Sequence, residues 1–145
     1  MTDLEVLRLH HIALTVSDLD ASVEWYSKVF GLQHLMDAPH PGGVGRILAD
    51  DTGSLVFSLH AHDRSAGEPF HETRTGLDHV GFVSRSRSDL ERWQEHLANH
   101  GVERAAAADR PLTQSPIADE PYGSVLVFRD RDNIQLELFA PPVQR

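Results

Sequence analysis

The 145-residue sequence contains no cysteine, so disulfide bonds and thiol chemistry contribute neither to its fold nor to its function. It also has no apolar run approaching the roughly 20 residues that a membrane-spanning helix needs. Basic residues are few: 13 lysines and arginines stand against 22 acidic residues, giving a formal net charge of −9. Because phosphate binding needs a basic face, this charge argues against a nucleic-acid-binding protein.

These absences also bear on location and ligand. Residues 1–5 show neither the basic segment nor the apolar core of a signal peptide. With the lack of cysteine, this favours a cytoplasmic protein that does not interact with membranes. The acidic surface favours neutral or cationic small molecules over anionic ones. The length is that of one domain, or of two small modules that share a core.

What the sequence does contain is an internal repeat. Residues 9–16 and 77–84 are both rich in apolar and β-branched residues, and each stretch carries a histidine near its start, His11 and His79. A helical pattern that ends at a glycine follows each of them. A repeat of about half the chain dictates the architecture before any other feature does.

Each half is expected to form a strand, a helix and three further strands (βαβββ), which is an α+β fold. The expected boundaries are a first module over 1–62, a polar linker over 63–75 and a second module over 76–145. The first strand is expected over 6–16, a proline- and glycine-containing loop over 40–43, and an irregular stretch over 109–121. The last hairpin is expected to pair 123–128 with 134–139.

Strand alternation places three metal-competent side chains away from the helices. In the first strand Ile12, Leu14 and Val16 share the helix-facing side, so His11 lies on the other side. The same parity puts His79 and Glu137 on the opposite face from their apolar neighbours. Each residue alone is more often structural, but two imidazoles and one carboxylate with open positions form the facial arrangement of a divalent-metal site.

A fourth ligand is less well defined. Superposing the last strand of the first half on that of the second puts Ser58 opposite Glu137 and His60 opposite Phe139. Serine is a poor ligand, so His60 is the alternative donor if the register shifts slightly. The remaining loop and strand-end histidines are expected to be solvated: His34, His40, His62 and His71.

Several motifs carry a resemblance to a known family: HIALTVSDL (11–19), WY (25–26), FGL (30–32), LDHVGF (77–82) and FRDRDNIQLELF (128–139). The chain resembles the vicinal-oxygen-chelate superfamily, which includes glyoxalase I, extradiol dioxygenases, fosfomycin-modifying enzymes and bleomycin-resistance proteins. The resemblance implies two tandem βαβββ modules that form an open barrel of curved sheets around a central cavity. It also implies one divalent ion, iron(II), manganese, nickel or zinc, held by His11, His79 and Glu137.

On this resemblance the chain is expected to be a metal-dependent enzyme of the glyoxalase-like lyase, isomerase or dioxygenase type, acting on a small substrate chelated through two oxygens. Glu137 would act as ligand and base, and Tyr122 as a proton donor or a packing residue. A homodimer is expected. The alternative is a non-catalytic protein of the bleomycin-resistance type that sequesters a small-molecule antibiotic in the dimer cavity, with which Trp25, Trp93, Phe70 and Tyr122 are compatible.

Overall fold

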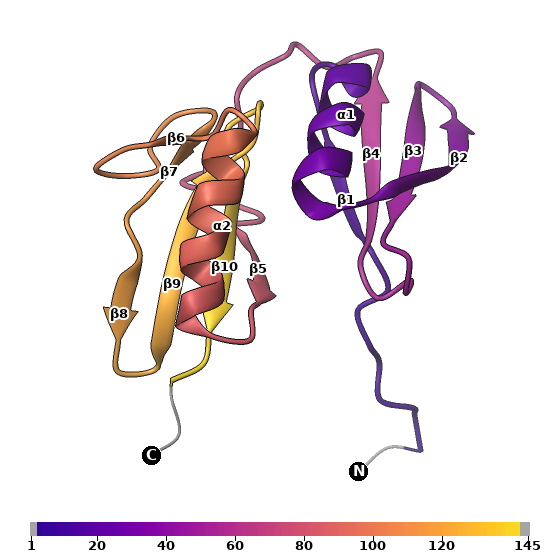
Figure 1. Cartoon of the computed structure of the whole chain (residues 1–145). Coiled ribbons are helices and arrows are strands. Elements are labelled where there is room, and N and C mark those ends of the chain that lie inside the picture. Colours follow the sequence, from indigo (N-terminus) through magenta and orange to yellow (C-terminus); the bar gives the residue numbers. More distant parts are fainter. Residues whose placement is uncertain (1–2, 143–145) are drawn as a thin grey trace. The chain divides into compact units, whose positions relative to one another are not determined.

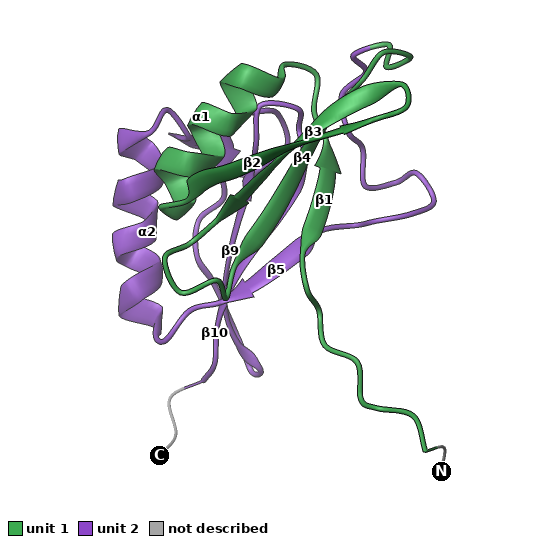
Figure 2. Cartoon of the chain, turned by 90° about the vertical axis from the view of Figure 1, so that its right-hand side faces the viewer, with its two compact units in different colours: residues 1–66 green, residues 67–145 purple. Residues whose placement is uncertain are grey.

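The computed structural model describes residues 3–142, so the outermost ends of both predicted modules lie outside the described residues. The chain divides into two compact units, Met1–Ala66 (unit 1) and Gly67–Arg145 (unit 2), shown in Figure 2. Each unit contains one helix and one sheet (Figure 1). The predicted α+β fold is confirmed. No helix within 3–142 is long and apolar enough to cross a membrane.

Unit 1 has the predicted βαβββ order. Its four-stranded sheet has the order β1-β4-β3-β2, in which β1 and β4 are parallel and the other pairs are antiparallel. The elements are β1 (Ile12–Thr15), α1 (Leu19–Phe30), β2 (Gln33–His40), β3 (Gly43–Ala49) and β4 (Val56–His62).

The first strand is shorter than the sequence predicts. The expected range is 6–16, but the strand spans only Ile12–Thr15, because its partner β4 begins at Val56 and Ile12 already lies opposite Phe57. Only Val56 of β4 precedes this point, so the segment before His11 has no residue of β4 to pair with. The apolar side chains of that segment are between 80% and 92% exposed: Leu4, Val6, Leu7 and Leu9.

The loop predicted over 40–43 is also shorter. His40 is the last residue of β2 and Gly43 the first of β3, so only Pro41 and Gly42 turn the chain. Gly42 has φ of 82°, a left-handed conformation that glycine adopts without a steric penalty. The extended strands bring His40 beside Gly43, which pairs in turn with His62 of β4.

Unit 2 repeats the arrangement with additional short strands. Its sheet has the order β5-β10-β9-β7-β6, with β8 pairing to β9. Helix α2 covers one face of β9 and β10 (Figure 1). The elements are β5 (Val80–Val83), α2 (Arg87–Asn99), β6 (Glu103–Arg104), β7 (Thr113–Gln114), β8 (Ala118–Glu120), β9 (Gly123–Arg129) and β10 (Gln135–Ala140). The stretch 109–121, expected to be irregular, thus contains β7 and β8.

The two units share the same pairing of first and last strands. In unit 1 the parallel β1–β4 pair sets Ala13 opposite Ser58, and in unit 2 the parallel β5–β10 pair sets Gly81 opposite Glu137. The side chains on the helix-facing side form the core, and burying each large one contributes about 1.5–3 kcal/mol. They include Leu14, Val16, Phe57 and Leu59 in unit 1, and Leu126, Phe128, Leu136 and Leu138 in unit 2.

Candidate functional site

In unit 2 the structure brings together two of the three predicted ligands. His79 immediately precedes β5, and Glu137 lies in β10 opposite Gly81. His79 Nε2 and Glu137 Oε2 are 3.5 Å apart. Two ligand atoms that share a metal at about 2.1 Å lie about 3.0–3.4 Å apart for angles between 90° and 109°. The pair therefore has close to the separation that a shared divalent ion requires.

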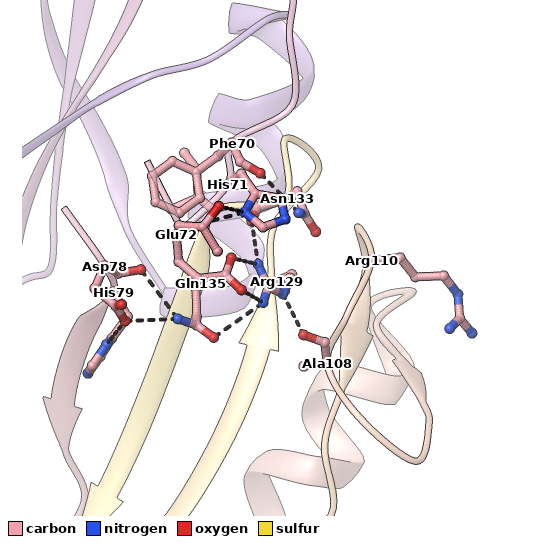
Figure 3. A network of polar contacts seen from close by, with 12 residues as sticks. Phe70, His71, Glu72, Asp78, His79, Ala108, Arg110, Arg129, Asn133 and Gln135 are labelled. Atoms are coloured by element: carbon pink, nitrogen blue, oxygen red, sulfur yellow. Dashed lines mark hydrogen bonds and ion pairs between the residues drawn. The ribbon is translucent and has the colours of Figure 1, made fainter. Parts of the chain in front are cut away.

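Asp78 fixes the orientation of the His79 ring (Figure 3). The Nδ1 of His79 lies 2.7 Å from Asp78 Oδ1, a carboxylate oxygen that accepts the Nδ1–H. The lone pair is then on Nε2, the nitrogen that faces Glu137. A histidine held by a carboxylate in this way is the usual outer-shell arrangement of metal-ligating imidazoles.

The Asp78 carboxylate is connected through Gln135 to a buried arginine, Arg129. Gln135 Nε2 donates to Asp78 Oδ1 at 3.2 Å, and Gln135 Oε1 accepts from Arg129 Nη2 at 3.3 Å (Figure 3). The Arg129 side chain is only 6% exposed and donates to both carboxylate oxygens of Glu72, at 2.8 and 3.1 Å. This hydrogen bonding lowers the pKa of the Glu72 carboxyl to about 2.

The sequence does not reveal this network, although two of its members carry a signal. Asp78 directly precedes His79 in the chain, and Gln135 lies two residues before Glu137, on the same face of β10. Glu72 falls in the predicted polar linker 63–75. Its contact with Arg129, and a hydrogen bond of 2.8 Å from Phe70 N to Asp132 O, instead make residues 67–75 an integral part of unit 2.

His11, the third predicted ligand, lies in unit 1. It precedes β1 by one residue, as His79 precedes β5 by one residue, so the two histidines occupy equivalent places in their units. Its Nδ1 is 2.8 Å from His10 Nδ1, with the two rings edge to face. Because the Nδ1 of His11 is engaged with His10, Nε2 is the ring nitrogen of His11 that lies outside this contact.

The structure gathers His60 with two histidines that the sequence predicts to be solvated. His40, at the end of β2, and His62, at the end of β4, lie with His60 such that one ring nitrogen from each is within 4.8 Å of the others. Burial lowers the pKa of the His60 imidazole, and repulsion from nearby His40 and His62 acts in the same direction. Ser58, at the position equivalent to Glu137, lies 2.7 Å from His60 Nε2 through its Oγ and is thus a partner of His60.

Tyr122 packs against the strand that carries Glu137. It lies between β8 and β9, is 64% exposed, and stacks on Phe139 with ring centroids 6.4 Å apart. Phe139 is two residues beyond Glu137 and shares its face of β10. The ring of Tyr122 is therefore near the carboxylate strand, where both of its predicted roles remain predictions.

Comparison with known proteins finds similar proteins that cover almost the whole chain. A domain from Frankia sp. EAN1pec, described as a glyoxylase/bleomycin resistance protein/dioxygenase domain, has 31% sequence identity and a TM-score of 0.82, covering 97% of this chain and 96% of that one. The YqjT protein of Bacillus subtilis (strain 168) is 29% identical over 136 residues, which are 92% of this chain and 98% of YqjT.

More distant structures share the fold. A mutant of the fosfomycin resistance protein FosX from Listeria monocytogenes, complexed with Mn(II) and 1S,2S-dihydroxypropylphosphonic acid, has a TM-score of 0.67 and 19% identity, covering 96% of this chain and 94% of that one. The family model of the Glyoxalase/Bleomycin resistance protein/Dioxygenase superfamily matches residues 8–138. With the repeated βαβββ units and the paired His79 and Glu137, this match shows that the chain belongs to the glyoxalase/bleomycin resistance protein/dioxygenase superfamily.

Proposed function

We propose that this protein is a metal-dependent enzyme in which His11, His79 and Glu137 hold one divalent ion. The observation that carries the proposal is the His79–Glu137 pair, 3.5 Å apart, with Asp78 on the opposite nitrogen of the imidazole. An imidazole and a carboxylate suit iron(II), manganese, nickel and zinc alike. The Mn(II) complex of FosX, a protein of the same fold, agrees with this choice of ion.

His11 completes the set in this proposal. Its place one residue before β1 matches that of His79 before β5, which is expected if the two units contribute symmetrically to one centre. Ser58 stands where the repeat would place a second carboxylate, and it is engaged with His60. The centre therefore has three protein ligands and retains open positions for a substrate.

The bound ion would act as a Lewis acid toward a small substrate that offers two neighbouring oxygens. Asp78 accepts the Nδ1–H of His79 and so sets the tautomer of the neutral ring, in which Nε2 carries the lone pair that would bind the ion. Glu137 presents two carboxylate oxygens, so one can ligate while the other accepts a substrate proton. Tyr122 is the proposed proton donor, close to the Glu137 strand through its stacking on Phe139.

The sequestration alternative receives no comparable support. Trp25 is 8% exposed and packs on Tyr26 and Phe30 in the core of unit 1, with ring centroids 4.8 and 6.4 Å away. Phe70 is held by backbone hydrogen bonds in unit 2. The side chain of Trp25 thus has a packing role, whereas the side chains of His79 and Glu137 are 42% and 24% exposed and face one another.

The experiment is elemental analysis and titration of the full-length protein after reconstitution with iron(II), manganese, nickel or zinc in turn. We expect one manganese per chain in the wild type, weaker binding in Glu137→Gln and almost none in His79→Ala, because a ligand is removed. Glu68→Gln, an exposed charge change in the same unit, is the matched control. Unchanged manganese binding in His79→Ala would refute the proposal. Binding of an aromatic or cationic drug, unaffected by His79→Ala, would then favour sequestration.

A further inference from the structure

Unit 1 contains a second group of potential ligands, the three-histidine cluster of His40, His60 and His62. The cluster forms where the end of β2, the start of β3 and the end of β4 meet, with Gly43 opposite both His40 and His62. Its ring centroids are 5.1 Å apart for His40–His60, 5.1 Å for His40–His62 and 6.0 Å for His60–His62. One nitrogen from each ring lies within 4.8 Å of the other two.

The nitrogen separations are close to those of ligands on one ion. His60 Nδ1 and His40 Nε2 are 3.1 Å apart. Two imidazole nitrogens bound tetrahedrally at 2.0–2.1 Å from zinc lie about 3.3 Å apart. His62 is exposed, so its ring can move the short distance that brings its nitrogen to the same ion.

The other nitrogen of each of these two rings, His40 Nδ1 and His60 Nε2, has a hydrogen-bond partner that determines which nitrogen carries the proton. The Pro41 carbonyl oxygen lies 3.2 Å from His40 Nδ1 and can only accept, so this nitrogen carries the proton and Nε2 has the lone pair. Ser58 Oγ lies 2.7 Å from His60 Nε2, and a hydroxyl can either donate or accept. When Oγ accepts a hydrogen bond from Nε2–H, Nδ1 of the neutral His60 ring carries the lone pair, and both facing nitrogens can act as ligands.

The backbone leaves space for these rings. Gly45 lies opposite His60 across the β3–β4 pair, and a Cβ there would come within 2.6 Å of the His60 ring. A Cβ on Gly43 would come within 2.8 Å of His40. The three rings border a cavity of about 480 Å³ that is also lined by Ala13 and Thr15 of β1. A fourth coordination position would therefore open toward solvent or a small oxygen ligand.

We propose that the three-histidine cluster binds Zn²⁺ or another late first-row divalent ion, at a site separate from that of His79 and Glu137. Three neutral imidazoles favour zinc, nickel and copper, whereas manganese prefers sites with carboxylate oxygens. Three protein ligands with one open position are the pattern of zinc sites that take a water molecule or a substrate. This assignment also gives His60 a different role from the fourth ligand that the sequence suggests.

The test is a zinc titration of the full-length protein against a chromogenic chelator, repeated with cobalt(II) to detect tetrahedral coordination by visible absorption. Two other groups can take up zinc: the proposed centre of His79 and Glu137, which the His79→Ala variant removes, and the His96 and His100 pair on α2, four residues apart with ring centroids 4.4 Å apart. All measurements therefore use a His100→Ala background. His34→Ala, which removes an exposed histidine of β2, is the matched control.

We expect His62→Ala and His60→Gln to abolish the tetrahedral cobalt spectrum, and Ser58→Ala to weaken zinc binding by about 10–100-fold. Gly45→Ala should weaken it as well, because the added Cβ displaces the His60 ring. Since His62 is exposed, its replacement does not threaten the fold. His34→Ala and His79→Ala should leave the site intact. Zinc binding that is unchanged in His62→Ala and His60→Gln, or lost in His79→Ala, would overturn the proposal. Failure of the wild type to bind manganese, with zinc binding intact, would overturn only the proposed function.

Discussion

Removing the Asp78 carboxylate should weaken metal binding without removing a ligand. Asp78 accepts the Nδ1–H of His79 at 2.7 Å and holds Nε2 toward Glu137. Loss of such an outer partner typically costs 10–100-fold in metal affinity. His79 is 42% exposed, so water can replace the lost acceptor, and we expect the lower limit for Asp78→Ala, about tenfold or about 1.4 kcal/mol.

The conservative replacement Asp78→Asn should reduce metal affinity less than Asp78→Ala does. Asp78→Asn keeps an oxygen that accepts from Nδ1 but loses the negative charge, and a neutral hydrogen bond has about half the strength of a charge-assisted one. Half of the free-energy loss corresponds to about a threefold weakening. The order of affinity should therefore be wild type, Asp78→Asn, Asp78→Ala and, far below them, His79→Ala.

The assay is titration of the full-length protein with manganese, with free Mn²⁺ followed by electron paramagnetic resonance. Manganese is the suitable probe because the three-histidine cluster should bind it more weakly than the later metals. Asp109→Ala removes an equally exposed carboxylate of unit 2 and is the control. If Asp78→Ala binds manganese as tightly as the wild type while His79→Ala does not bind it, Asp78 does not orient the ligand. If Asp78→Ala is as defective as His79→Ala, Asp78 is itself a ligand.

Three further predictions concern stability and assembly. Glu72→Gln should lower the free energy of unfolding by about 3 kcal/mol, measured by urea denaturation, because it leaves the buried Arg129 guanidinium without its counter-ion; an unchanged value would show that the pair is not structural. Because the pKa of Glu72 is lowered from 4.5 to about 2, the unfolded state takes up the proton first, so this contribution is complete above pH 4.5 and is lost as the pH falls toward 2. A wild-type stability that falls no more than that of Glu72→Gln across this range would contradict the assignment. Light scattering should give twice the chain's 16.2 kDa, since the exposed apolar segment before β1, with Leu4 and Leu7, favours burial against a second copy, and a mass near 16.2 kDa would contradict a homodimer.

The sequence by itself determined the elements that depend on local pattern. Alternation placed Leu136 and Leu138 on the buried face of the last strand and Glu137 on the other, because successive side chains of a strand point to opposite sides. The repeat related His11 to His79, and both do precede the first strand of their unit by one residue. These features required no knowledge of strand pairing.

The tertiary structure decided what depends on pairing between distant segments. The β2–β3–β4 register places His40 beside His60, 20 residues away, whereas the sequence alone left His40 in a loop. Arg129 and Glu72 are 57 residues apart, and they meet only because residues 67–75 pack against the rest of unit 2. Strand length is also a tertiary property, since β1 starts within one residue of the point where its partner β4 begins. Register and docking arise from hydrogen bonds and burial between segments, and a local sequence pattern does not encode them.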